Sequence, residues 1–119
     1  MDNRIKVFEI DRSKPLSIRK GQPNDRPEEL LIKLVDYFRN DETVEKSVLG
    51  LVEFADAPVL GLFAYVVGVY GSENSRVIPD LKNITFQVNM ERWPIVFADM
   101  EFESGLVSDQ NFVIYDKHS

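Results

Sequence analysis

The sequence VLGLFAYVVGVY, residues 59–70, contains no charged side chain and is the most apolar part of the chain. Exposing apolar surface to water costs about 25 cal/mol for each Å². We therefore expect this stretch to be the most buried element of the protein, with the rest of the chain folded around it.

Two secondary structures fit residues 59–70, because periodicity cannot separate a strand from a helix when both faces are apolar. The length favours a helix, and Gly71 behind the stretch could end one. The composition favours a strand, since β-branched and aromatic residues are frequent and Gly61 and Gly68 would each weaken a helix. We predict a central strand, with a buried helix as the alternative.

The apolar stretch is not predicted to cross a membrane. Extended back to Val48 it would be long enough, but Glu53 and Asp56 interrupt it. A charged side chain near the centre of a membrane helix costs about 2.5–3.5 kcal/mol on insertion scales. We therefore expect this stretch to belong to the core of a water-soluble protein.

Length and composition predict a single domain over residues 1–119. A chain of this size can bury a core without disulfides or bound metal. The absence of cysteine excludes thiol catalysis, a cysteine-ligated zinc site and a disulfide framework. The first residues, MDNRIKVFEI, lack the apolar region of a secretory signal, so a cytoplasmic location is expected.

The formal net charge of −6 is unevenly distributed along the chain. Residues 1–26 carry seven basic and four acidic side chains, whereas residues 27–119 carry seven basic and sixteen acidic ones. An acidic body argues against binding nucleic acid, whose phosphates require clustered Lys and Arg. It suits the docking of a basic protein, although many cytosolic proteins are acidic for solubility alone.

The most regular helical pattern covers residues 26–39. Apolar residues recur there at helical spacing, and charged residues occupy the other positions. Asp25 and Glu28 have the spacing of a capping box, and Pro27 suits the first turn. The pattern predicts a helix whose apolar side packs against a sheet.

Residues 41–55 are predicted to form a second helix. At about 100° per residue, the acidic side chains of this segment fall on one side, opposite a stripe that includes Val44 and Leu51. Gly50 weakens this prediction, and a strand over residues 47–54 is the alternative. The break between this helix and the one predicted over residues 26–39 is short, so the two helices would lie as a pair on one face of a sheet.

Five stretches are predicted to be strands: residues 4–10, 59–70, 83–90, 95–102 and 111–115. Apolar and polar side chains alternate best in NITFQVNM, residues 83–90, and the polar residues 71–82 before it are predicted to be a connection. Short connections predict that the last four strands form an antiparallel meander. The expected fold is therefore α+β, an antiparallel sheet of four to five strands with two helices, about 26–39 and 41–55, packed on one face.

Asp99, Glu101 and Glu103 are the sharpest functional feature of the sequence. Spaced two apart on the strand predicted over residues 95–102, they would project from one face as an acidic ladder. Such a ladder could dock Arg and Lys side chains of a partner, with Trp93 at the preceding turn as an apolar anchor. The simpler interpretation is a solvated strand face that discourages aggregation. A divalent-cation site is less favoured, because no matching ligand cluster accompanies the carboxylates.

Catalytic groups are scarce in this sequence. His118 is the only histidine and lies next to the last residue, where chains fray. No serine has the sequence context of a nucleophile elbow, and Glu53 with Asp56 would be a carboxylate pair without a further partner. We therefore expect no enzymatic activity, no cofactor and no bound metal.

Three classes of function fit these observations. The favoured class is an immunity or inhibitor protein, which neutralises a basic toxin or enzyme by occluding its active site. The second is a secretion-type or adaptor chaperone acting as a homodimer. The third is a small-molecule-binding or enzymatic α+β domain.

A homodimer is one of two ways to cover the second face of the predicted sheet. A central strand that is apolar on both sides needs cover on each face of its sheet. Two helices would cover one face, and the N-terminal segment or a second subunit would cover the other.

Overall fold

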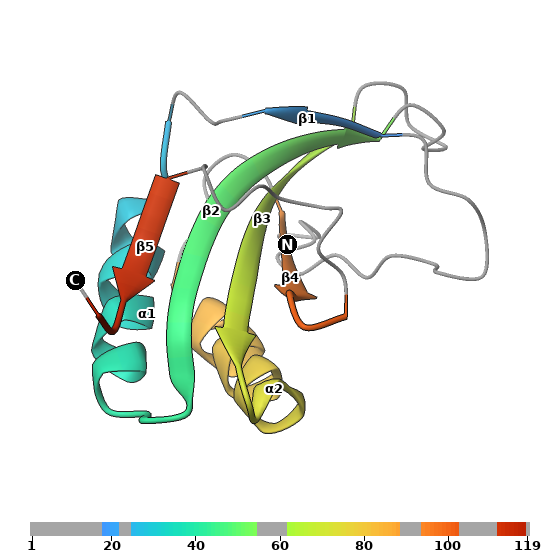
Figure 1. The fold of residues 1–119 in the computed structure, drawn as a ribbon. Helices are drawn as coiled ribbons and strands as arrows, with labels where there is room; N and C mark the ends of the chain where they lie inside the picture. Colours follow the sequence, from blue (N-terminus) through green and yellow to red (C-terminus); the bar gives the residue numbers. More distant parts are fainter. Residues whose placement is uncertain (1–17, 22–24, 55–61, 89–93, 103–111, 119) are drawn as a thin grey trace.

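The computed structural model describes residues 18–21, 25–54, 62–88, 94–102 and 112–118. Its elements are, in chain order, β1 (Ile18–Gly21), α1 (Glu28–Arg39), β2 (Val44–Phe54), β3 (Leu62–Gly71), α2 (Asn74–Thr85), β4 (Ile95–Asp99) and β5 (Phe112–Asp116) (Figure 1). Two helices and one sheet make an α+β fold, as predicted.

The five strands form one mixed sheet (Figure 1). β2 and β3 are the long central pair and run antiparallel, with Val48 opposite Gly68. β1 and β5 both pair antiparallel with the edge of β2 that faces away from β3, at residues 51–54 and 46–49 respectively. β4 pairs with the other edge of β3 and runs parallel to it. The purely antiparallel sheet predicted from the sequence is therefore wrong.

β3 lies in the interior of the sheet, paired with β2 along one edge and with β4 along the other. Residues 64–69 of this strand are all buried. The strand predicted from the apolar sequence is thus confirmed, and its helical alternative is wrong. Residues 59–61 of the predicted strand lie outside the described residues.

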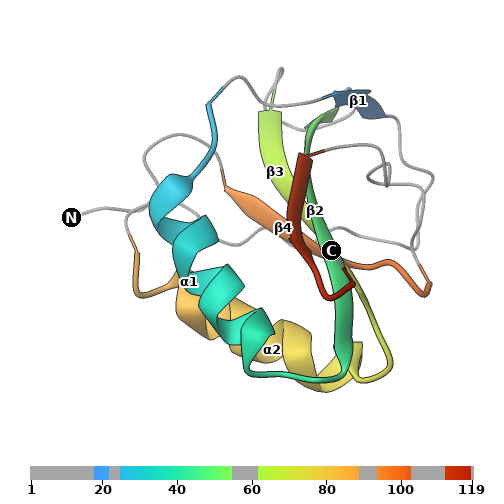
Figure 2. The same cartoon turned by 60° about the vertical axis from the view of Figure 1, so that its left-hand side comes forward.

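Both helices lie on one face of the sheet, side by side (Figure 2). Their apolar sides pack on the strands and form the larger core cluster. That cluster combines Leu30, Leu34, Phe38, Val77 and Leu81 of the helices with Leu49, Tyr65, Val67, Val69, Ile95 and Phe97 of the sheet. Two helices on one face are therefore confirmed, although only α1 was placed correctly along the sequence.

The opposite face of the sheet is also apolar. Its cluster contains the buried side chains that alternate with those of the helical face: Val48, Val52, Ala64, Val66, Val96, Ala98 and Met100. Neither described helix lies on this face. The predicted cover by the N-terminal segment concerns residues 1–17, which lie outside the described residues, so this cover and the homodimer stay predictions.

The helix predicted over residues 26–39 is confirmed as α1. The capping box is wrong, because Pro27 occupies the N-cap position and no side chain caps the helix. Asp25 lies two residues upstream of that position, too far to cap the first turn. Glu28 in the first turn and Arg39 in the last complement the helix dipole instead.

The helix predicted over residues 41–55 is wrong, because most of this segment forms β2. Val48 and Val52 of β2 are buried on one face of the sheet, and Leu49 is buried on the other. Strand pairing along both edges satisfies the backbone of a segment that is buried on both faces. The alternative, a strand over residues 47–54, is confirmed.

The strand predicted over residues 83–90 and the connection predicted over 71–82 are both wrong, because α2 occupies most of this region. The buried residues of α2 recur at helical spacing: Asn74, Val77, Leu81 and Thr85. Pro79 lies inside the helix at an exposed position. Tertiary packing of Val77 and Leu81 therefore outweighs the hydrogen bond that a proline cannot donate.

The antiparallel meander is wrong for the same reason. α2 returns the chain from the end of β3 to the beginning of β4, so the two strands run parallel. The carboxyl ends of β3 and β4 therefore lie at the same edge of the sheet. The strand predicted over residues 111–115 is confirmed as β5, and the strand predicted over 4–10 lies outside the described residues.

Candidate functional site

A hollow of about 570 Å³ lies where β3 and β4 end and α2 begins. It is lined by Glu45, Gly71, Ser72, Asn74, Ser75, Asp99, Glu101 and Phe102. Crevices outside the carboxyl ends of parallel strands are the usual binding sites of sheets that contain such strands. The β3–α2–β4 unit thus places this hollow, which we call the acidic hollow, at a favoured position.

Asn74 joins the three elements that meet at the acidic hollow. Its Nδ2 donates to the carbonyl of Val69 in β3 (2.9 Å) and to Oδ1 of Asp99 in β4 (2.8 Å). The side chain is almost fully buried, with 4% of the residue exposed. Oδ1 of Asn74 is also buried and has no hydrogen-bond partner within the described part of the chain. The amide therefore fixes the floor of the hollow through its two donated bonds.

Gly71 allows the end of β3 to approach the neighbouring turn closely. A Cβ at this position would lie 2.5 Å from the carbonyl oxygen of Thr43 and 3.0 Å from Oδ1 of Asn74. The contact with the Thr43 carbonyl oxygen is shorter than real Cβ contacts, and that with Asn74 is tight, so a side chain here would force the neighbouring backbone to shift. The amide of Ser72 donates to the same carbonyl of Thr43 at 3.3 Å, which holds the two segments together.

The acidic ladder predicted on one strand face is wrong. β4 ends at Asp99, and residues 100–102 form a turn. Asp99 accepts from the amide of Glu101 at 3.1 Å as well as from Asn74, so its carboxylate is held inside the hydrogen-bonded floor. Glu101 is exposed at the rim instead. Glu103 and Trp93, the other two predicted partner-binding residues, lie outside the described residues.

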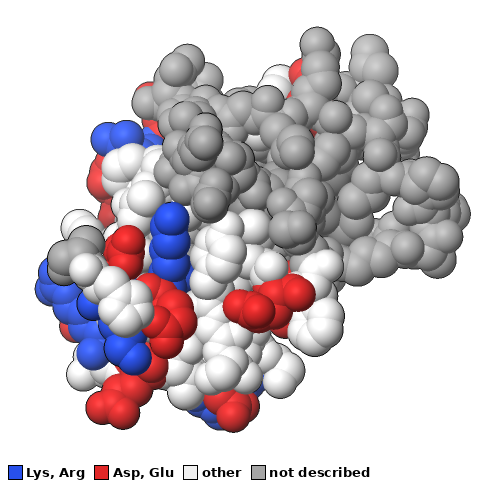
Figure 3. All heavy atoms as spheres, viewed as in Figure 1, with Lys and Arg blue, Asp and Glu red and all other residues white. Residues whose placement is uncertain are grey.

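Phe102 is the most exposed large apolar side chain of the described residues, with 87% of its surface accessible. Its amide donates to the carbonyl of Asp99 at 2.9 Å, so the turn holds the ring at the hollow. Acidic atoms gather near the end of β4 with uncharged atoms beside them (Figure 3). Aromatic side chains, Phe among them, are enriched in the buried centres of protein interfaces.

Glu45 of β2 lies on the other side of the acidic hollow. Nε2 of His118 lies 2.7 Å from one of its carboxylate oxygens, and Nζ of Lys117 lies 3.8 Å from the other. Lys117 also donates to the carbonyl of Glu42 at 2.8 Å. These contacts place the residues after β5 beside the hollow. His118 is thus an exposed partner of Glu45.

A second polar cluster joins the end of α1 to α2. The Tyr37 hydroxyl donates to Asp80 at 2.8 Å, and Arg76 forms an ion pair with Asp41 at 3.1 Å. The Thr43 hydroxyl donates to Asp41 at 2.6 Å. Tyr37 of α1 meets Asp80 of α2, while Asp41, just beyond the end of α1, meets Arg76 earlier in α2. The two helices therefore run antiparallel.

The charges of this cluster shift two pKa values. Burial, followed by the hydrogen bond to Asp80, raises the pKa of Tyr37 to about 12. Burial alone would raise the pKa of Asp41, but hydrogen bonds from Thr43 and Arg76 outweigh it and lower the pKa to about 2. Tyr37 is therefore protonated and Asp41 ionised at neutral pH, the states in which the hydroxyl donates to Asp80 and the carboxylate pairs with Arg76.

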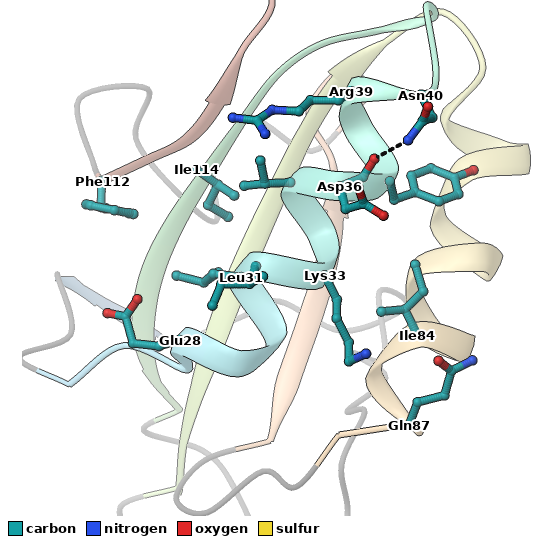
Figure 4. A pocket seen from close by; sticks show the side chains of 13 residues that line it. Glu28, Leu31, Lys33, Asp36, Arg39, Asn40, Ile84, Gln87, Phe112 and Ile114 are labelled. Atoms are coloured by element: carbon teal, nitrogen blue, oxygen red, sulfur yellow. Dashed lines mark hydrogen bonds between the residues drawn. The ribbon is translucent and has the colours of Figure 1, made fainter.

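A larger groove, of about 930 Å³, follows the outer surface of α1 on both sides. Phe112 and Ile114 of β5 border one side, and Ile84 and Gln87 border the other (Figure 4). Apolar and charged side chains of α1 alternate along it. This groove has no counterpart among the sites that the sequence predicted.

The sequence predicted two residues of the acidic hollow and missed most of the others. Ser72 and Asn74 were missed because residues 71–82 are predicted to be a connection, and Phe102 was missed because the strand predicted over residues 95–102 continues past Asp99. The helical spacing of Asn74, Val77 and Leu81 was the signal that could have found the beginning of α2.

Neither a metal-ligand cluster nor a membrane-crossing helix occurs among the described residues. These residues contain no group of three or more His, Cys, Asp or Glu side chains that could hold a metal ion. Neither described helix is long and apolar enough to cross a membrane. Comparison with protein-family models, with curated proteins and with solved structures finds no match to this chain.

Proposed function

We propose that this protein binds a basic protein partner at the acidic hollow, as an inhibitor of the immunity type that occludes the partner's active site. The partner would present an Arg or Lys side chain to the carboxylates of Glu45 and Glu101, beside an apolar residue in contact with Phe102. Asp99 acts as a positioning residue in this proposal, because it is already held by Asn74.

The observation that carries the proposal is the exposure of Phe102. Exposing an aromatic ring to this extent forfeits about 1.5–3 kcal/mol of burial energy, which a partner can recover. Single exposed apolar residues are common on protein surfaces. The ring of Phe102 differs because it lies at a hollow bordered by three carboxylates: Glu45, Asp99 and Glu101.

Charge supports a basic partner over an acidic or neutral one. The chain carries a net charge of −6, and none of the described residues that line the hollow is basic, although Lys117 and His118 contact Glu45 beside it. Complementary charge accelerates association by steering the partner, and like charge at an interface costs several kcal/mol. An inhibitor that must reach its target quickly gains from both effects.

Direct binding can be tested with a probe of the proposed chemistry. The ¹⁵N-labelled protein is titrated with a short peptide that alternates Arg with Leu, and separately with the same peptide carrying Glu in place of Arg. The basic peptide is expected to shift the amide signals of Ser72, Ser75, Glu101 and Phe102, whereas the acidic peptide leaves them unchanged. Shifts confined to other surfaces would refute the acidic hollow as the site.

A double variant and a matched control separate the site from net charge. Glu101→Lys with Phe102→Ser is expected to abolish binding of the basic peptide. Glu42→Lys with Val113→Ser makes the same charge change and also replaces an apolar side chain by serine, at residues that are exposed and lie outside the hollow. Equal loss in both double variants would mean that only net charge matters.

Occlusion of an active site requires a separate experiment. A toxin-like enzyme encoded beside this protein would be assayed with increasing amounts of it. The proposal expects activity to cease at an equimolar ratio, and to return with the Glu101→Lys, Phe102→Ser variant. A complex that forms while the enzyme stays active would leave the binding site intact and reject the inhibitor function.

A further inference from the structure

α1 carries a second stripe of residues that does not face the core. Glu28, Ile32, Val35 and Arg39 follow one another at intervals of four, three and four residues. This is the spacing with which coiled-coil helices meet, since it keeps side chains on one side of a helix over several turns. We call these four residues the outer seam of α1.

The outer seam is separate from the residues that attach α1 to the sheet. The buried residues of α1 are Leu30, Leu31, Leu34 and Phe38, and none of them belongs to the seam. Ile32 is 70% exposed, Glu28 and Arg39 are exposed, and Val35 is half-buried. The helix is therefore anchored by one stripe and leaves the other available.

The outer seam lines the groove of about 930 Å³ that follows α1. Glu28 and Arg39 lie at opposite ends of the helix and project to the same side of it (Figure 4). Phe112 of β5, which is 36% exposed, borders the groove on that side. An apolar centre is thus flanked by an acidic end and a basic end.

We propose that a second copy of this chain docks on the outer seam, with its own α1 antiparallel to the first. In that arrangement Glu28 of each copy lies opposite Arg39 of the other, at both ends of the contact. Ile32 of each copy lies opposite Val35 of the other, so four apolar side chains meet at the two-fold axis. A two-fold interface must match itself in this way, because the same surface is used on both sides.

The order of charges selects this orientation. A parallel pair would place Glu28 beside Glu28 and Arg39 beside Arg39, where like charges repel. The antiparallel pair converts both contacts into attractions. Each exposed ion pair contributes only about 0–1 kcal/mol, so the charges fix the orientation, and the apolar centre supplies most of the affinity.

Ion pairs already present in the described residues do not compete strongly with this contact. Nε of Arg26 lies 3.3 Å from Glu28, but both side chains are well exposed and the pair can be shared. Arg26 also lies over the ring of Phe112, 4.3 Å from its centroid. Arg39 has no ion-pair partner among the described residues.

The size of the seam sets the expected affinity. A helix of 12 residues is about 18 Å long, so its contact buries less than the roughly 800 Å² per partner of a standard interface. A reversible dimer with a Kd of about micromolar or weaker follows. The seam shares no residue with the acidic hollow, so this inference stands independently of the proposed function.

Sedimentation equilibrium over a range of protein concentrations tests the dimer. Arg39→Glu and Glu28→Arg each create two like-charge contacts and are expected to weaken dimerisation at least about tenfold. The double variant Glu28→Arg, Arg39→Glu restores both attractions and is expected to recover most of the wild-type affinity. Ile32→Ser removes the apolar centre and is expected to give a monomer whose melting temperature in dilute solution is unchanged.

Glu42→Arg is the matched control, since it makes the same charge change at an exposed residue outside the seam. Its dimerisation is expected to equal that of the wild-type protein. A wild-type protein that stays monomeric at submillimolar concentration would overturn the inference. A dimer that ignores the charge exchange would overturn it too, and would point to the opposite face of the sheet as the interface.

Discussion

The side chain of Asn74 donates a hydrogen bond to Asp99 at 2.8 Å, and so joins the first residue of α2 to the last residue of β4. The same amide nitrogen reaches the carbonyl of Val69, which also accepts from the amide of Met100 at 3.0 Å. Residues far apart in sequence thus meet at one buried amide. The acidic hollow owes its shape to this contact.

Asn74→Ala is expected to lower the free energy of unfolding by about 1–3 kcal/mol, because it removes two hydrogen bonds that join α2 to β3 and β4, although each acceptor keeps one other donor. Asn74→Asp is expected to cost more at neutral pH, since a second carboxylate would then face Asp99. Urea denaturation at pH 7 measures both changes. An Asn74→Asp protein as stable as the wild type would show that the two side chains are not in contact.

Gly71→Ala is expected to destabilise the fold by about 1–3 kcal/mol, because the added methyl group would meet the backbone of Thr43. The obstacle is a carbonyl of the main chain, which cannot turn away as a flexible side chain can. Thermal melting provides the measurement. A melting temperature equal to that of the wild-type protein would mean that the turn containing Thr43 is free to move.

Acid is expected to weaken the clasp between the helices. The folded pKa of Asp41, about 2, lies below its ordinary value of 3.8. The ionised carboxylate therefore stabilises the fold above about pH 4, and this contribution is lost as the pH falls towards 2. In Asp41→Asn the loss of stability between pH 4 and pH 2 is expected to be smaller than in the wild-type protein.

Alkali is expected to act on Tyr37 in the opposite sense. Its folded pKa of about 12 lies above the ordinary value of 10, so the neutral phenol stabilises the fold below pH 10. That contribution is lost as the pH rises from 10 towards 12. Tyr37→Phe is expected to flatten this part of the stability curve, and an unchanged curve would contradict the assignment.

Val66→Asp is expected to unfold the protein, because Val66 is fully buried in the cluster on the face away from the helices. Val113→Asp makes the same substitution in β5, where the side chain is 43% exposed, and is expected to change stability by less than about 1 kcal/mol. Circular dichroism and urea denaturation compare the two. A cooperative transition in Val66→Asp would show that this face tolerates water.

Binding at the acidic hollow is expected to weaken with salt. Raising the ionic strength from about 0.1 M to 1 M shortens the screening length from about 10 Å to 3 Å, which removes long-range attraction. The affinity of the basic peptide should therefore fall in the wild-type protein. In a Phe102→Ser variant the salt dependence should persist while the affinity drops, because the carboxylates remain. An affinity that does not depend on salt would exclude electrostatic docking.

Parts of this fold follow directly from local sequence. Residues 62–71 form a strand because their β-branched and aromatic side chains pack on both faces of a sheet. α1 is equally plain, since one stripe of leucines and Phe38 alternates with charge over three turns. In both cases a single local pattern decides between helix and strand.

Two other elements were misassigned because their local pattern fits both structures. In β2, the valines that suggested a helical stripe are buried on opposite faces of the sheet, between two pairing partners. In α2, the alternation around residue 84 resembled a strand, and Pro79 obscured the helical spacing that begins at Asn74. Contacts with residues distant in the sequence decided the secondary structure of both segments.

The candidate site was likewise predictable only in part from the local sequence. Acidity around residue 99 was visible in the sequence, but the ladder required a strand that continues past Asp99. The strand ends there, because Asp99 accepts from Asn74 and from the amide of Glu101. One carboxylate thereby became part of the floor, and Phe102 became the exposed feature of the rim.

An α+β fold, an apolar central strand, a leucine-rich first helix and an excess of acidic side chains could all be predicted from the chain's residues. Each of these depends on composition or on spacing within one segment. The parallel pairing of β4 with β3, the connection of the two strands through α2, and the meeting of Asn74, Asp99 and Phe102 at one hollow could not be predicted in this way. Those relations depend on contacts between segments, and the energy of such contacts is not encoded in the periodicity of any single segment.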